Sequence, residues 1–165
     1  MLSICIPVYN FDVNALVDEL LAQAARVACP VEILVFDDFS QSFYRARNRR
    51  LSQLPQVHYL EFDYNLGRSR IRNRLADFAH GEWLLFIDCD MMPETPAFLA
   101  AYADMLGQAP VVYGGRTQGP RPKHSALLLR WRYGQKTECQ KAIIRQLQPY
   151  STFMGGNFLI EKELC

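Results

Sequence analysis

The sequence predicts an α/β fold in which helices cover both faces of a mostly parallel central sheet. Apolar runs of strand length alternate with helix-like segments along the first half of the chain, which is typical of such folds. These runs lack the polar alternation of a half-exposed strand, as expected for parallel strands buried on both faces. We therefore expect a three-layer α/β/α arrangement, in which functional residues gather at the carboxyl ends of the strands.

The length and composition suit one folded domain over residues 1–165. With 50% hydrophobic and 21% charged residues, the chain has the balance of a soluble globular protein and can bury a sizeable core. Its formal net charge of +1 provides no overall attraction to nucleic acid, so we expect no nucleic-acid partner. Recognition of anions then depends on local groups of basic residues.

The cysteines favour reduced thiols rather than disulfides or a zinc site. Their number, five, is odd, and they are widely separated, without a CxxC pair or a Cys/His spacing suited to zinc. The first segment has no basic region of a signal peptide, and no apolar run reaches about 18 residues. We expect a cytoplasmic chain, with peripheral attachment to the inner face of a membrane left open.

The first strand is expected over LSICIPVYN, where Pro7 ends it. The next segment, NALVDELLAQAARV, has apolar residues at the i, i+3, i+4 and i+7 spacing of an amphipathic helix, and Asp12 or Asn14 can cap its start. The second strand, VEILVF, runs into Asp37 and Asp38. A polar turn and a short helix around residues 44–51 are expected to follow it.

The third strand is expected over VHYLEF, before the turn DYNLG and a helix over about residues 69–79 that Gly81 ends. The fourth strand is EWLLFID. Beyond Pro93 we expect a helix over about residues 95–106, a short strand VVYGG and two basic amphipathic stretches, LLLRWRYG and KAIIRQLQ. The strand ends that carry polar or acidic residues are Pro7 to Asn10, Asp37 to Ser40 and Asp88 to Asp90.

The fourth strand ends in two aspartates, Asp88 and Asp90. If strand geometry continues to Asp90, the two side chains face the same side and Cys89 points away. Two like charges so close raise one pKa unless a divalent cation neutralises both, and carboxylate oxygens suit Mg²⁺ or Mn²⁺. The competing interpretation is a pair of capping or solvated turn aspartates, and the two residues alone leave both open.

The acidic pair after the second strand also has two interpretations. Asp37 and Asp38 could accept hydrogen bonds from a nucleobase or from ribose hydroxyls. Alternatively, Asp38 and Ser40 could bond to their own backbone in a turn, which is a common use of these residues.

Arginines occur at every second position in NLGRSRIRNRLADF. On a helix this spacing divides them between two faces, Arg68 with Arg72 and Arg70 with Arg74. One pair can be a solvated face, while the other can point towards the strand ends, where a guanidinium suits a diphosphate or a nucleobase edge. Near the end, two glycines in FMGGNFLI permit positive φ or close approach of a ligand, or form a simple tight turn.

Taken in order, SICIPVYN, EILVFDDFS, NLGRSRIRNRLADFAHGEWLLFIDCDMMP and FMGGNFLIEKEL resemble family 2 glycosyltransferases of the GT-A fold. The resemblance spans nearly the whole chain and depends on five elements in the right order and spacing. One departure is Phe39, at a position where the family commonly has glycine. The resemblance implies a Rossmann-like GT-A domain that transfers a sugar from a nucleotide sugar, usually a UDP-sugar, to a glycan or another hydroxyl acceptor.

The resemblance also implies roles for the residues at matching positions. Those expected around the nucleotide are Pro7, Tyr9, Asp37, Asp38, Arg72 and Asp88. Asp90 would be the principal ligand of Mn²⁺ or Mg²⁺, with Asp88 in the ribose contact or the metal shell. The residues expected to line the donor-sugar and acceptor pocket are Gly155, Gly156 and Asn157.

Further expectations concern the reaction. The resemblance implies metal-dependent, inverting transfer in polysaccharide or glycoconjugate synthesis, with a carbohydrate or glycolipid as acceptor. In the family, the general base lies in an acidic motif downstream of the segment that FMGGNFLIEKEL resembles, and this sequence stops at Cys165. We therefore expect a truncated catalytic domain that binds a donor and transfers sugar poorly or not at all.

Three other functions compete with this one. A nucleotide-sugar-binding module without transferase activity would fit a chain that lacks the base. A nucleotidyltransferase should have a glycine-rich, basic loop after its first strand, and PVYNFDVN has none. A phosphatase of the haloacid dehalogenase type has its DxD after the first strand of the core and Thr or Val two residues later, where this chain has Met92.

Overall fold

Six strands form one sheet in the computed structural model, which describes residues 1–165. The strands are β1 (Leu2–Val8), β2 (Val31–Asp37), β3 (Val57–Glu61), β4 (Trp83–Ile87), β5 (Val111–Tyr113) and β6 (Asn157–Glu161). Their order is β3-β2-β1-β4-β6-β5. The pairs among β1 to β4 are parallel, whereas β6 is antiparallel to both β4 and β5. This confirms the predicted α/β fold with a mostly parallel sheet.

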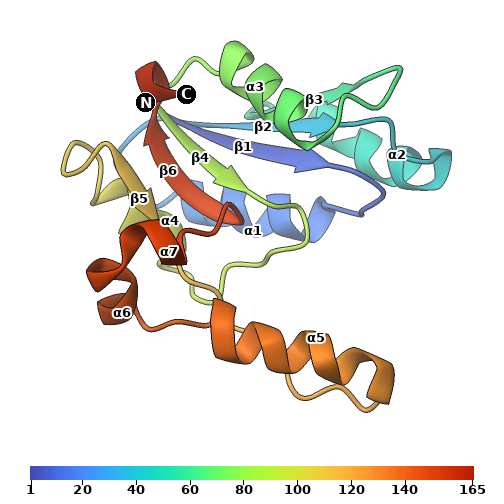
Figure 1. Cartoon of the computed structure of the whole chain (residues 1–165). Coiled ribbons are helices and arrows are strands. Elements are labelled where there is room, and N and C mark those ends of the chain that lie inside the picture. Colours follow the sequence, from blue (N-terminus) through green and yellow to red (C-terminus); the bar gives the residue numbers. More distant parts are fainter.

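Helices cover both faces of this sheet (Figure 1). The α-helices of the chain are α1 (Asn14–Ala24), α2 (Ser42–Asn48), α3 (Arg68–Phe78), α4 (Phe98–Ala103), α5 (Leu128–Tyr133), α6 (Ala142–Leu147) and α7 (Pro149–Thr152). A 3₁₀ helix, Arg49–Gln53, extends α2. The helices α1 and α4 lie on one face, and α3 lies on the other.

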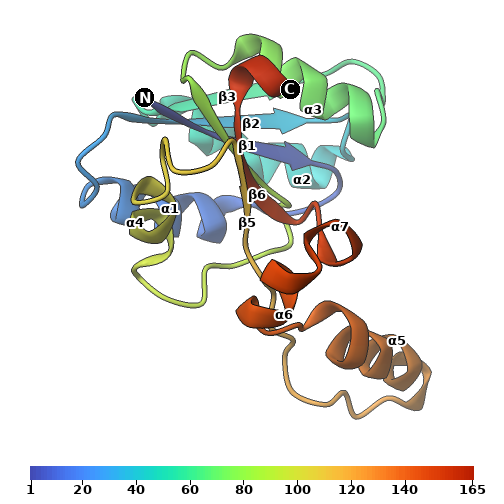
Figure 2. The same ribbon diagram turned by 60° about the vertical axis from the view of Figure 1, so that its left-hand side comes forward.

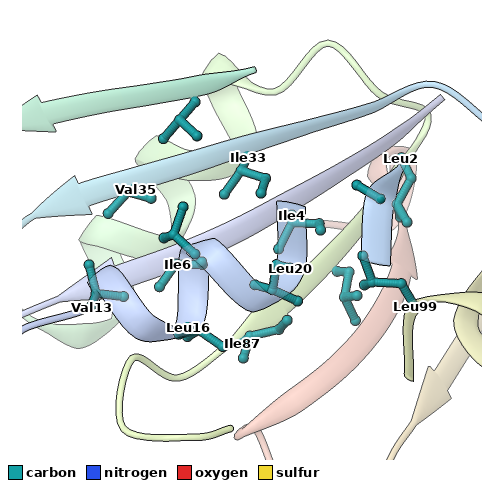
Figure 3. Packing of buried hydrophobic residues seen from close by; sticks show 14 of the residues in the cluster. Leu2, Ile4, Ile6, Val13, Leu16, Leu20, Ile33, Val35, Ile87 and Leu99 are labelled. Carbon is teal, nitrogen blue, oxygen red and sulfur yellow. The ribbon is translucent and has the colours of Figure 1, made fainter. Parts of the chain in front are cut away.

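Alternation along β1 divides the core into two apolar clusters. Ile4 and Ile6 face α1, where they pack with Leu16 and Leu20, as Figure 3 shows. Cys5 points to the opposite face and belongs to the cluster that α3 covers. Each cluster buries one apolar stripe of a helix, which is the main stabilising contribution to such a layer.

The start of α1 is held by side chains on both sides of it. The N–H of Val13 donates to Asn48 Oδ1 at 3.2 Å, and the N–H of Asn14 donates to Asp12 Oδ1 at 3.2 Å. Of the two residues expected to cap this helix, Asp12 therefore accepts a hydrogen bond from its first turn. Asn14 is instead the first helical residue.

Two predicted helix ends differ from the structure. The helix α3 ends at Phe78, with Ala79 already extended, so Gly81 does not end it. Gly81 instead packs against β1, where its N–H donates to Ser3 Oγ and a Cβ would lie 2.6 Å from that oxygen. The helix predicted over residues 95–106 is shorter, because α4 spans Phe98–Ala103 and the residues beside it form turns.

The segment between β5 and β6 projects from the sheet (Figures 1 and 2). We call residues 116–153, which include α5, α6 and α7, the helical arm. Gly134 is the only buried residue in it, and none of its side chains joins either apolar cluster. No helix of the chain is both long enough and apolar enough to cross a membrane.

Candidate functional site

A cleft of about 470 Å³ opens at the carboxyl ends of β1 and β4, beside the start of α3. Five of the six positions predicted for nucleotide binding line it. They are Pro7, Tyr9, Asp38, Arg72 and Asp88. These residues come from four separate parts of the chain, and the parallel arrangement of the strands brings them to one edge of the sheet.

Asp37, the sixth position, does not line the cleft. Its side chain is 0% exposed, and Oδ1 accepts the N–H of Ser40 at 2.7 Å and lies 3.7 Å from Arg45 Nε. Burial raises the pKa of this carboxyl group above its usual range. Asp37 therefore holds the loop after β2, and the local aspartate turn expected for Asp38 is made by Asp37 instead.

Asp38 uses both carboxylate oxygens to fix the loop before α3. Oδ1 accepts the N–H of Leu66 at 2.6 Å, and Oδ2 accepts the N–H of Gly67 at 3.0 Å. Asn65 donates its side-chain amide to the carbonyl of Asp38 at 2.9 Å. These bonds position the first turn of α3, which carries the arginines of the cleft.

Phe39, at the position where the resemblance implies glycine, has a φ of +69°. This left-handed conformation is strained for a residue with a bulky side chain. The exposed ring of Phe39 lies 5.1 Å from the guanidinium of Arg45, in a cation–π arrangement. The departure from glycine therefore leaves Asp38 in the cleft wall and places the strain in the loop.

Arg68 and Arg72 form the pair of arginines that faces the cleft. Arg72 makes an ion pair with Asp88 Oδ1, and Arg68 lies 3.4 Å from Asp88 Oδ2. Arg70 and Arg74 are exposed on the other side of α3. The predicted division of the arginines into two faces is therefore confirmed.

Burial and charge act in opposite directions at Asp88. Burial raises the pKa of Asp88, and the guanidiniums of Arg72 and Arg68 reduce this rise. Burial also lowers the pKa of Arg72. The two opposite charges thus share a partly desolvated site, where the guanidiniums of Arg68 and Arg72 can also contact an anionic group that enters the cleft.

The expectation that strand geometry continues through Asp90 is wrong. The strand β4 ends at Ile87, and the N–H of Met91 donates to the carbonyl of Asp88 at 3.0 Å in a turn. Asp88 and Asp90 nevertheless line the same cavities. Cys89 lies at the same cleft, but it also packs against the apolar cluster beneath α1, and burial raises the pKa of its thiol to about 11.

Asp90 lies where three cavities meet. Besides the cleft, it lines a cavity of about 270 Å³ with Gly155 and Gly156, and another of about 520 Å³ on the side of Tyr102. Its carboxylate is exposed and makes no ion pair or hydrogen bond with the protein. Asp90 is therefore a carboxylate that is available to a ligand.

The acidic residues fit a divalent cation only in part. Asp88 and Asp90 supply carboxylate oxygens to the same cavities, but no group of three or more His, Cys, Asp or Glu residues is arranged to hold a metal. Mg²⁺ and Mn²⁺ commonly bind through one or two carboxylates and complete their shells with water and substrate phosphates. The two aspartates fit a metal that a phosphorylated ligand helps to bind.

The residues predicted for the donor-sugar pocket line the cavity of about 270 Å³. Neither glycine has a positive φ, but the carbonyl of Gly156 accepts the N–H of Asp88 at 2.8 Å, and a Cβ there would lie 2.8 Å from Met91 Sδ. The amide of Asn157 accepts from Tyr102 Oη at 2.6 Å and donates to the carbonyl of Gly115 at 3.1 Å. Close packing thus explains Gly156, and Asn157 ties β6 to its neighbours.

Sequence reasoning missed three residues of this cavity. Arg116 and Arg130 both pair with Glu138, at 3.1 and 3.0 Å, and all three line the cavity opposite Asp88 and Asp90. Arg130 lies in α5 and Glu138 ends the π-helix Gly134–Glu138 that follows it, whereas Arg116 lies in the loop after β5. The basic composition of LLLRWRYG was visible in the sequence, but not the position of Arg130 beside the aspartates.

The fold is similar to those of several solved glycosyltransferases. The mannosyltransferase PcManGT from Pyrobaculum calidifontis, in complex with GDP-Man and Mn²⁺, aligns with a TM-score of 0.66 and 19% identity, over 99% of this chain and 45% of that one. Glucosyl-3-phosphoglycerate synthase from Mycobacterium tuberculosis, with Mn²⁺, UDP and glucosyl-3-phosphoglycerate, aligns with a TM-score of 0.62 and 18% identity, over 99% and 57%. TarS 1-349 from S. aureus aligns with a TM-score of 0.58 and 20% identity, over 99% and 47%.

These likenesses concern the fold, and the chain spans about half the length of the proteins it resembles. No curated protein sequence gives a significant match. The sequence model described as glycosyl transferase family 2, in contrast, matches residues 3–165, which is nearly the whole chain. The chain therefore belongs to glycosyl transferase family 2.

Proposed function

We propose that the chain binds a nucleotide sugar, with a UDP-sugar as the expected donor, and acts in metal-dependent transfer of the sugar to a hydroxyl acceptor. The observation that carries this proposal is the free carboxylate of Asp90 beside the partly buried Asp88, where the cleft meets two further cavities. Membership of glycosyl transferase family 2 supports the reaction class. The complexes of similar folds with Mn²⁺ and GDP-Man, or with Mn²⁺ and UDP, support the ligand class.

The cleft offers groups for each part of such a donor. Pro7 and Tyr9 provide an apolar and aromatic wall for the nucleobase and ribose, and the exposed ring of Tyr9 is free to stack. Arg68 and Arg72 stand at the side of Asp88, where the diphosphate would lie. Asp38 acts through the loop it fixes, since its side-chain oxygens are already bonded to backbone N–H groups.

The charges of the site suit departure of a nucleoside diphosphate. The bond between the sugar and the diphosphate breaks with negative charge developing on the leaving group, which the guanidiniums of Arg68 and Arg72 would stabilise. Asp88 and Asp90 would hold Mn²⁺ or Mg²⁺, and the bound cation supplies further charge stabilisation without proton transfer. Arg116 and Arg130 lie across the same cavity and add positive charge near the sugar side.

The acceptor would approach from the cavities of about 270 and 520 Å³, on the far side of Asp90 from the nucleotide. We expect a carbohydrate or glycolipid hydroxyl and inversion at the transferred carbon. A general base must then take the proton of that hydroxyl. Glu138 is poorly suited to this role, because both Arg116 and Arg130 pair with it.

Calorimetry with a panel of nucleotide sugars tests the proposal directly. Each UDP-sugar and GDP-sugar is titrated into the chain in Mn²⁺, in Mg²⁺ and in EDTA. We expect at least one UDP-sugar to bind, with an affinity at least about tenfold higher in metal, which corresponds to about 1.4 kcal/mol. Equal affinity in metal and EDTA, or no binding by any nucleotide sugar, would contradict the proposal.

A further inference from the structure

The helical arm differs sharply in charge from the rest of the chain. Eight of the chain's 18 Lys and Arg residues lie within residues 116–153, but only one of its 17 Asp and Glu residues does. The arm therefore carries a charge of +7 and the remainder a charge of −6. The net charge of +1 conceals this asymmetry, which attracts an anionic surface to the arm alone.

The helix α6 exposes apolar side chains and partly buries a basic one, the opposite of a typical surface helix. Ile143 and Leu147, four residues apart on one face, are 58% and 72% exposed. Arg145, on the opposite face, is partly buried, and its guanidinium donates to the carbonyl of Gln140 at 2.6 Å. Apolar side chains thus point to solvent, while the basic one points to the protein.

The helix α5 shows aliphatic, aromatic and basic groups on one exposed face. Leu129 is 81% exposed, and Arg132 and Tyr133 follow it at the i+3 and i+4 positions of the same face. Trp131 points inward, where its indole N–H donates to the carbonyl of Gly119 at 2.9 Å. Tyr150, beyond α6, is 99% exposed.

The arm is therefore well suited to an interface that is both apolar and anionic. Exposed aliphatic side chains lose water favourably in the headgroup and acyl boundary of a bilayer, while Lys and Arg extend to the lipid phosphates. Each basic residue near an anionic leaflet adds to this attraction. An acidic protein surface would match the charge, but the exposed leucines and isoleucines beside these bases favour lipid.

We propose that the helical arm is a docking surface for a bilayer that contains anionic phospholipid. The arm also supplies Arg130 and Glu138 to the cavity that Asp90 lines, so a docked bilayer would lie beside that cavity. Figure 2 shows the arm projecting from the body of the sheet, where a flat surface can reach it. Docking needs no nucleotide, so it does not depend on the proposed function.

Flotation with lipid vesicles tests this surface. The chain is mixed with vesicles of phosphatidylcholine alone or with added phosphatidylglycerol, at low and high NaCl. We expect flotation only with phosphatidylglycerol and less of it in high salt, because salt screens the charges. Neutralising Arg132 and Lys141 together (R132Q, K141Q) should weaken binding by at least about tenfold.

Two further variants test the exposed leucines of the arm and whether docking is specific to the arm. The double variant Leu129→Glu, Leu147→Glu should abolish flotation, because it places carboxylates where the acyl boundary would lie. A matched control, Arg26→Gln with Arg70→Gln, removes two exposed arginines from the body and should leave flotation unchanged. Circular dichroism and the affinity for the nucleotide sugar should be the same in all these variants, which separates lost docking from lost folding.

Three results would overturn the proposal. One is failure of the wild-type chain to float with phosphatidylglycerol, and another is flotation that the arm variants leave unchanged. The third is self-association without lipid that Leu129→Glu, Leu147→Glu abolishes, because it would assign the surface to the negatively charged body of a second copy. Intact nucleotide-sugar binding beside any of these results would leave the proposed function standing.

Discussion

Arg72, on α3, forms an ion pair with Asp88, in the turn after β4, and Arg68 approaches the other oxygen of the same carboxylate at 3.4 Å. The side chains of Arg72 and Asp88 are only 16% and 27% exposed, so solvent screens their interaction weakly. This contact joins the helix that carries the cationic side of the cleft to the turn that carries both aspartates.

Arg72→Ala should lower the free energy of unfolding by about 1–3 kcal/mol, because it leaves Asp88 partly buried without its main partner. Removing this guanidinium should also raise the pKa of Asp88 further, since Arg72 counteracts the effect of burial. Chemical denaturation checks the stability. Arg74→Ala is the matched control, because Arg74 is exposed and lies 3.9 Å from Asp77, and it should change stability by less than about 0.5 kcal/mol.

The stability contributed by Asp37 should depend on pH with a predictable sign. Burial raises its pKa in the folded chain above the reference value of 3.8, so the folded state binds this proton more tightly than the unfolded state. Stability due to Asp37 therefore increases as the pH falls through the raised pKa towards 3.8. The difference in unfolding free energy between Asp37→Asn and wild type should shift in favour of wild type over that interval.

Asp12 provides a control of opposite sign for this experiment. Its hydrogen bond with Asn14 lowers its pKa below 3.8, so its stabilising contribution is present above pH 3.8 and is lost as the pH falls through the lowered pKa. Urea denaturation should show a slope for Asp12→Asn below pH 3.8 and a slope of opposite sign for Asp37→Asn above pH 3.8. Parallel slopes would contradict the assignment of Asp37 as a carboxylate destabilised by burial.

Replacing Phe39 with glycine should relieve backbone strain. At a φ of +69°, glycine is favoured over a residue with a Cβ by about 1 kcal/mol. Phe39→Ala loses the cation–π contact with Arg45 but keeps the strain, whereas Phe39→Gly loses both. The glycine variant should thus be the more stable of the two by about 1 kcal/mol in thermal denaturation, and equal stability would show that the loop is unstrained.

The two glycines before β6 should respond differently to alanine. A Cβ at Gly156 would lie 2.8 Å from Met91 Sδ and 3.7 Å from Asp88 Oδ2, so Gly156→Ala displaces the methionine and narrows the cavity. We expect weaker binding of the nucleotide sugar by about tenfold or more, measured by calorimetry. Nothing lies within 4 Å of a Cβ at Gly155, so Gly155→Ala should bind as wild type does. Equal nucleotide-sugar affinities of the two variants would contradict the assignment of Gly156 to the binding site.

Much of the fold follows from local patterns. The apolar runs at β1, β2 and β4 and the periodicity of α1 and α3 reflect burial, which the sequence records directly. The pairing of Arg68 with Arg72 is equally local, since residues four apart share a helix face. The role predicted for Gly81, to end a helix, is wrong because this glycine is needed for a contact with Ser3. The two residues are 78 positions apart, so no local pattern predicts the contact.

The site was harder to predict where distant segments meet. The expected strand geometry at Asp88 and Asp90 fails because the chain turns after Asp88, whose carbonyl accepts the N–H of Met91. Asp37 and Asp38 look alike in sequence, but Asp37 accepts a hydrogen bond from its own loop, at Ser40, whereas Asp38 accepts one from Leu66 in the loop before α3. Arg116 and Glu138 are 22 residues apart, on either side of α5, so no local pattern predicts their contact.

The measurement that tests the central claim most directly is the affinity of Mn²⁺ for the chain in the presence of UDP, followed by the electron paramagnetic resonance signal of free Mn²⁺. We predict that Asp90→Asn lowers this affinity by at least about tenfold. Glu94→Gln, which changes an exposed carboxylate four residues away in the neighbouring cavity, should leave it unchanged. Wild-type affinity in folded Asp90→Asn would contradict the assignment of Asp90 as the ligand that joins the metal to the nucleotide.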